Sequence, residues 1–112
     1  MKRFNTQFDL LITPATAVPA FEVGRVSPDL PDWKQAGVTS APEDWTWWTP
    51  FSFPFNLTQQ PALSIHCGFT QTGVPGLPIG LQIVAPAYRE DLALRAAAAF
   101  EAVRGPVTWP TL

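Results

Sequence analysis

Three side chains able to act as nucleophile or base lie within residues 64–67. Ser64, His66 and Cys67 supply a hydroxyl, an imidazole and a thiol, which are groups used in nucleophilic hydrolysis. In an extended strand, neighbouring side chains point to opposite faces, so His66 and Cys67 would point apart. Ser64 and His66 would share a face, but no Asp or Glu lies nearby to orient the imidazole. We therefore interpret Cys67 as a small core residue and predict no self-contained catalytic residues.

Other kinds of site receive little support. The sequence has no glycine-rich phosphate loop, no metal-ligand spacing and no Ser-centred nucleophile elbow. A single His predicts no metal site, and no cofactor is expected. The formal net charge of −2 offers no basic patch, so nucleic acid is not an expected partner.

The composition predicts one domain with more apolar surface than it can hide. Of the 112 residues, 46% are hydrophobic and 14% charged, whereas about 25% charged residues is usual. Such an excess indicates a missing partner, which could be a second protein chain, a ligand or the rest of a larger domain. One cysteine excludes an internal disulfide framework and fits a reducing compartment. The first apolar run, residues 10–12, is too short for export or for crossing a bilayer, so we expect a cytoplasmic protein without membrane association.

The first half of the chain predicts little regular structure. Residues 2–8 could form a helical turn with Phe4 and Phe8 on one face. The apolar run at residues 10–13 suits a buried strand covered on both faces. Residues 14–50 show no period of 2 or 3.6 and contain repeated Pro and Gly, which indicates a long irregular loop. Within it, a helical turn could start at residues 42–45.

The second half predicts a β-hairpin followed by a helix. Residues 62–69 and 78–84 are apolar runs around a Gly/Pro-containing connection, typical of antiparallel strands. Residues 90–104 lack Gly and Pro and consist mostly of strong helix formers. The expected apolar stripe of this helix is Leu92, Ala96, Ala99, Phe100 and Val103. Trp109, in an extended tail, is expected to pack back on the body.

A dense group of aromatic residues precedes the hairpin. Six aromatic side chains occur in eleven residues: Trp45, Trp47, Trp48, Phe51, Phe53 and Phe55. We favour a core contact in an incomplete domain, because large aromatic residues are usually buried. The wall of a substrate pocket is the second interpretation. Stacking on a membrane surface or a carbohydrate is the third, although no Lys/Arg-rich helix accompanies the group.

Two motifs carry a resemblance to a known family. The runs Asn56-Leu57-Thr58-Gln59-Gln60-Pro61-Ala62-Leu63-Ser64 and Gly76-Leu77-Pro78-Ile79-Gly80-Leu81-Gln82-Ile83-Val84 resemble the C-terminal part of amidase signature hydrolases. Residues 8–14 are similar to that family's buried strand, and residues 88–96 to its last helix. The implied fold class is α/β. Residues 1–112 would be one partial domain of a mixed-sheet fold, containing the strand, the Pro-rich loop at 14–50, the hairpin and the C-terminal helix.

The resemblance implies cleavage of carboxylic amide C–N bonds by a Ser-Ser-Lys machinery that this chain does not contain. The expected partner is therefore the N-terminal part of such an enzyme, or a second copy of the chain, with a small amide as substrate. In this interpretation the chain completes the sheet of the enzyme, forms a wall of the acyl or amine pocket and is inactive alone. The candidate pocket residues are Trp47, Trp48, Phe51, Phe53 and Asn56.

Two departures from the family pattern bear on activity. Gln60 stands where the family usually has Gly before Pro-Ala, and His66 where it commonly has Pro. If that Gly must adopt positive φ, Gln60 would cost about 1–2 kcal/mol. The alternative function is a non-catalytic binding or interaction module, or a gene remnant, derived from an amidase.

Overall fold

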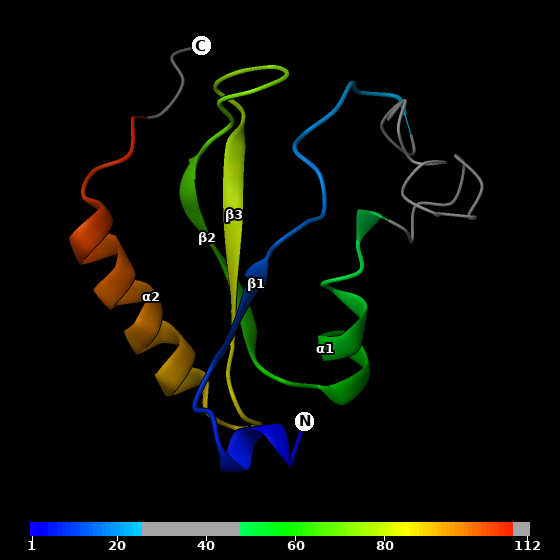
Figure 1. Ribbon diagram of the computed structural model, residues 1–112. Helices are drawn as coiled ribbons and strands as arrows, with labels where there is room; N and C mark the ends of the chain where they lie inside the picture. The colour runs from blue at the N-terminus through cyan, green and yellow to red at the C-terminus, as the bar shows by residue number, and fades with distance from the viewer. Residues whose placement is uncertain (26–47, 109–112) are drawn as a thin grey trace.

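The computed structural model describes residues 1–25 and 48–108 (Figure 1). It is a mixed α/β structure with one antiparallel sheet in the order β1-β3-β2. Its elements are the 3-10 turn η1 (Phe4–Thr6), β1 (Leu11–Pro14), α1 (Phe53–Thr58), β2 (Ala62–Phe69), β3 (Pro78–Val84) and α2 (Glu90–Arg104). In Figure 1, α1 and α2 stand on opposite sides of the sheet.

The predicted hairpin is confirmed with its predicted bounds. β2 and β3 pair antiparallel, from Ala62 opposite Val84 to Phe69 opposite Pro78. The ladder is interrupted by a bulge at Cys67, between His66 and Gly68. Thr70 closes the connecting loop, because its N–H donates to the Leu77 carbonyl at 2.9 Å and its hydroxyl accepts from the Leu77 N–H at 3.0 Å. The loop therefore has fixed ends.

The C-terminal helix is also confirmed, but its predicted apolar stripe is partly wrong. Ala93 and Ala97 are the buried positions of α2 and form the core with Ile83 and Ala85. Val103, expected in the stripe, is 89% exposed. In a helix so rich in Ala, the closest approach to the sheet is made by the smallest side chains, so the contact face is rotated from the stripe of larger residues.

The first turn of α2 carries an ion pair on the surface. The Arg89 guanidinium donates to both carboxylate oxygens of Asp91, at 2.8 and 3.0 Å. The hydrogen bond from Arg89 lowers the pKa of Asp91, and the same bond raises the pKa of Arg89. A carboxylate in this turn also suits the positive end of the helix dipole.

The prediction of a strand buried on both faces is wrong for the described chain. β1 is an edge strand whose residues alternate between half-buried and exposed, and Ile12 is 58% exposed. The physical reason is the position of α2, which packs over β2 and β3 and leaves the Ile12 side chain uncovered. An unbroken apolar run indicates that a strand is suited to burial on both faces. It does not show which polypeptide buries the strand.

The remaining predictions for the first half have mixed outcomes. η1 is the predicted turn, with the Phe4 and Phe8 rings 4.9 Å apart. Residues 15–25 and 48–50 contain no strand or α-helix. The predicted turn at 42–45 and the packing of Trp109 lie outside the described residues. In the part that the structure describes, no helix has the length and hydropathy needed to cross a membrane.

The sequence did not predict α1, and this helix explains the departure at Gln60. Pro54 lies in its first turn, where a proline removes no helical hydrogen bond. The helix ends at Gln59, whose φ of 53° is left-handed. Gln60 therefore does not carry the positive φ. Its amide instead donates to the Ala85 carbonyl at 3.2 Å and its side-chain oxygen accepts from the Thr58 hydroxyl at 3.0 Å.

Replacing Gln59 by Gly is expected to raise the free energy of unfolding by about 0.5–1 kcal/mol. The change removes the strain of a left-handed backbone conformation at a non-glycine residue, which is about 1–2 kcal/mol. Part of this gain is lost because glycine raises the conformational entropy of the unfolded chain. Gln60→Gly is the matched control one residue later, and it should destabilise because it loses the bond to Ala85. Urea unfolding of both variants measures their free energies of unfolding. Equal changes in the two variants would contradict the assignment of the strain to Gln59.

Candidate functional site

A row of three polar side chains crosses the face of the sheet opposite the α2 core. Gln82 of β3 pairs with Thr13 of β1 on one side and Ser64 of β2 on the other. Paired residues of antiparallel strands project to the same face, so the three side chains share it. The Gln82 amide nitrogen donates to the Thr13 hydroxyl at 2.9 Å and to the Phe51 carbonyl at 2.9 Å. The Thr13 hydroxyl donates in turn to the Pro14 carbonyl at 3.0 Å.

These contacts fix the aromatic segment that precedes α1 against the sheet. The Phe51 backbone is held by Gln82, and the Trp48 carbonyl accepts from the Ala17 N–H at 3.2 Å. The Trp48 ring meets Phe21 edge to face, with ring centroids 5.4 Å apart and planes at 84°. Residues from β1, β3 and the segment after β1 therefore position Trp48 and Phe51 together.

The predicted pocket residues occupy different environments. Trp48, Phe51 and Phe53 are half-buried, and Asn56 is exposed on α1. Phe55, named only in the aromatic group, is the buried one, at 7% exposure. Trp47 lies outside the described residues. The core interpretation thus holds for Phe55, and the pocket role of the other residues stays a prediction.

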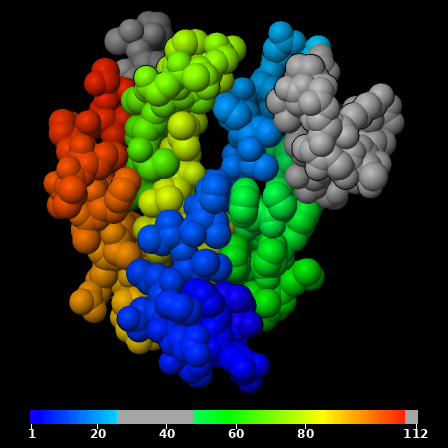
Figure 2. Space-filling view, in the orientation of Figure 1, coloured from blue at the N-terminus to red at the C-terminus, as the bar shows by residue number. Residues whose placement is uncertain are grey.

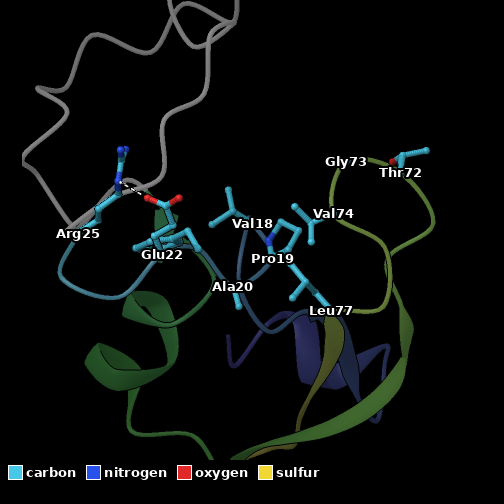
Figure 3. A pocket seen from close by; sticks show the side chains of 10 residues that line it. Val18, Pro19, Ala20, Glu22, Arg25, Thr72, Gly73, Val74 and Leu77 are labelled. Atoms are coloured by element: carbon cyan, nitrogen blue, oxygen red, sulfur yellow. Dashed lines mark ion pairs between the residues drawn. The ribbon is translucent and has the colours of Figure 1, made fainter. Parts of the chain in front are cut away.

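A cavity of about 430 Å³ lies between the segment after β1 and the hairpin loop (Figure 3). In Figure 2 a hollow separates these two parts of the chain. Its lining is mostly apolar, including Val18, Phe21, Val74 and Leu77. The Glu22–Arg25 ion pair, 3.2 Å between charged atoms, lies at one end.

None of the five predicted pocket residues lines this cavity, although Trp48 contacts its wall through Phe21. The sequence predicts only irregular loop for residues 18–25, so it does not predict that they line a cavity. The apolar run Ala17-Val18-Pro19-Ala20-Phe21 was the available signal. Gln82 was not predicted either, although it is the one polar residue in the middle of an apolar strand.

The possible nucleophiles and base do not form a catalytic group in the described residues. The Cys67 thiol donates to the Ile79 carbonyl at 3.4 Å from within the bulge. The His66 ring packs 4.6 Å from the Phe69 ring, and its nitrogens are buried without a hydrogen-bond partner in residues 1–25 and 48–108. Over the same ranges no three His, Cys, Asp or Glu side chains gather as metal ligands.

Comparisons with known proteins give a consistent assignment. The family profile described as Amidase matches residues 1–94. An acylamidase of Rhodococcus erythropolis is 36% identical over 102 residues, which is 90% of this chain and 19% of that enzyme. A glutamyl-tRNA(Gln) amidotransferase polypeptide of Salinispora tropica is 38% identical over 106 residues, or 95% of this chain and 18% of that polypeptide.

A solved structure agrees with the sequence comparisons. The structure of 6-aminohexanoate cyclic dimer hydrolase superposes with a TM-score of 0.68 and 33% identity, over 91% of this chain and 20% of that one. The chain thus spans about a fifth of the length of the relatives it matches.

Proposed function

The chain belongs to the amidase family, and from that premise we propose that it is the C-terminal part of an amidase-signature hydrolase that cleaves carboxylic amide C–N bonds. In this proposal the chain supplies structure and a pocket wall, and the remaining portion of the enzyme supplies the Ser-Ser-Lys machinery. The chain alone is inactive and works in the cytoplasm. The observation that carries the proposal is the family match over residues 1–94, together with relatives of which this chain covers only a fifth.

The polar row supports the assignment of a pocket wall. Gln82 belongs to the Gly-Leu-Pro-Ile-Gly-Leu-Gln motif and holds the backbone of Phe51. Substrate pockets are lined by apolar and aromatic side chains, with a few polar groups in fixed places. We assign the wall to Trp47, Trp48, Phe51, Phe53 and Asn56, and Gln82 holds the backbone of Phe51 among them.

The expected result is no hydrolysis by the highly purified 112-residue chain and hydrolysis after complementation. The complementing polypeptide is the Rhodococcus erythropolis acylamidase without the stretch that aligns with this chain. A chromogenic anilide of a short carboxylic acid reports amide cleavage, and each polypeptide alone is the control. Hydrolysis by the isolated chain would contradict the claim that it is inactive alone. A mixture of the two polypeptides that neither associates nor hydrolyses the anilide would contradict the proposed role in an enzyme.

A binding module without chemistry is the second candidate, and one observation favours it. The cavity of about 430 Å³ lies between residues 18–25 and the hairpin loop, and its volume lies in the range of small-molecule pockets. A module of this kind would be a stable monomer that binds an apolar ligand without any complementing polypeptide. Absence of complementation, with ligand-dependent thermal stabilisation of the chain alone, would favour the module over the enzyme part.

A further inference from the structure

The cavity in Figure 3 has two walls that hydrogen bonds hold in place. On the hairpin side, the buried Thr70 hydroxyl donates to the Val74 carbonyl at 2.5 Å, and the Gly76 N–H donates to the Thr70 carbonyl at 3.0 Å. On the other side, the Ala17 N–H donates to the Trp48 carbonyl at 3.2 Å. Small-molecule sites are usually formed before their ligand arrives, so walls fixed in this way suit a ligand site.

The lining of the cavity suits an apolar group. Val18, Pro19 and Ala20 come from the segment after β1, and Val74 and Leu77 come from the hairpin loop beside it (Figure 3). Apolar side chains from two segments far apart in the sequence therefore meet around one space. Removing apolar ligand surface from water into such a space is favourable.

The charges among the described lining residues pair with each other. Glu22 and Arg25 are the ionisable residues of this lining, and their side chains lie 3.2 Å apart. The side chains are 83% and 41% exposed, so the pair lies at the solvent end of the cavity. A charged ligand would have to compete with this pair for its counter-ion, whereas a neutral group would not. The lining therefore favours a neutral ligand.

Phe21 connects the cavity with the aromatic segment before α1. It lines the cavity, and its ring meets the Trp48 ring edge to face with centroids 5.4 Å apart. Trp48 and Phe51 belong to the segment that the proposed function assigns to the wall of the substrate pocket. The cavity thus adjoins the place where an amide substrate would bind, with one side chain between them.

We propose that the cavity is the subsite for a neutral apolar group of the amide substrate, and that it selects amides carrying such a group over small amides. The group is an alkyl or aryl substituent on the acyl carbon or on the amide nitrogen. This inference rests on the proposed function and adds the substrate class. The segment after β1 and the hairpin loop supply the specificity, and the remaining portion of the enzyme supplies the hydrolysis.

Three amides test the binding step on the 112-residue chain itself. Hexanamide carries the apolar group on the acyl carbon, N-hexylacetamide carries it on the nitrogen, and acetamide carries none. Each amide is titrated and its binding is followed by ligand-observed NMR. One of the two longer amides is expected to bind about tenfold or more tightly than acetamide, because its chain leaves water. The amide that binds more tightly shows which side of the substrate enters the cavity.

Two pairs of variants locate this binding. Ala20→Phe places a large side chain in the lining, and Ala98→Phe, at an exposed position of α2, is its matched control. Val74→Lys places a charge on the hairpin wall, and Val103→Lys is its control; these two side chains are 66% and 89% exposed, so neither change should unfold the chain. The lining variants are expected to bind the preferred amide about tenfold more weakly than their controls.

The complemented enzyme tests the specificity. With the Rhodococcus acylamidase portion present, Ala20→Phe is expected to lower kcat/KM for the preferred amide about tenfold through a higher KM, because the lost contact is made by the bound substrate and the transition state alike. Hydrolysis of acetamide should be unchanged, and Ala98→Phe should match the wild-type chain. The ammonia or amine released is measured. A merely structural effect of Ala20→Phe would lower the rates for both amides together.

The outcomes distinguish this inference from the proposed function. Equal binding of the three amides by the wild-type chain, or equal binding by the lining variants and their controls, would overturn the cavity assignment and leave the enzyme role standing. A parallel loss of hydrolysis for both amides in Ala20→Phe would also overturn it. Binding that depends on the cavity, without hydrolysis after complementation, would overturn both proposals and favour the binding module.

Discussion

Replacing Gln82 by Leu is expected to lower the free energy of unfolding by about 2–3 kcal/mol. The Gln82 amide donates two hydrogen bonds at 2.9 Å, to the Thr13 hydroxyl and the Phe51 carbonyl. A net hydrogen bond contributes about 0.5–1.5 kcal/mol, and a buried acceptor left without a donor costs a further penalty. Leucine restores neither bond, so β1 and the segment before α1 both lose their tie to β3.

Urea unfolding with matched variants measures this effect. Gln7→Leu, at an exposed position before β1, is the control and should change stability by less than about 0.5 kcal/mol. Tryptophan emission should also change more in Gln82→Leu than in the control, because Trp48 lies in the released segment. Equal stability of the two variants would show that the amide of Gln82 does not hold this segment.

Replacing Gly80 by Ala is expected to destabilise the sheet by about 1–3 kcal/mol, the usual cost of overpacking. A Cβ at Gly80 would lie 2.8 Å from the Ala15 Cβ and 2.9 Å from the Ser64 Oγ. These two atoms belong to residues on either side of Gly80 across the sheet, so moving away from one brings it closer to the other. The effect is steric, because Gly80 does not have a left-handed φ.

A double-mutant cycle tests the steric explanation. Ala15→Gly removes the atom at 2.8 Å, so Gly80→Ala should cost less in that background, with a coupling of about 0.5–3 kcal/mol. Gly73→Ala is the contrasting control, because its Cβ meets open space and its φ of 72° causes the strain. Unfolding free energies that add independently for residues 15 and 80 would contradict the contact.

The elements that the sequence predicted well are those whose signals are local. Residues 62–69, 78–84 and 90–104 have strand or helix composition and end at Gly, Pro or polar turns, and the structure has the same bounds. α1 is not predicted, because residues 53–58 are too few to show a helical period, although Pro54 is compatible with the first turn of a helix.

The burial of individual side chains and the contacts of the candidate site were harder to predict from the sequence. The exposure of Ile12 depends on which polypeptide covers the edge of β1, and no local pattern contains that information. The hydrogen bond from Gln82 to Phe51 joins residues 31 positions apart, so neither sequence neighbourhood predicts it. The family resemblance supplied the expectation of an amidase, whereas the positions of Trp48 and Phe51 required the fold.

The strand order has a consequence for synthesis on the ribosome. β3 is the central strand, yet it follows both of its neighbours in the chain, and Leu11 pairs with Val84. At about 5–20 residues per second, translation takes roughly 4–15 s to pass from β1 to the end of β3. Over that interval the nascent β1 has been made but its partner has not, while the hairpin and α2 need only nearby residues. Of the three described strands, β1 is therefore the one made longest before its partner β3.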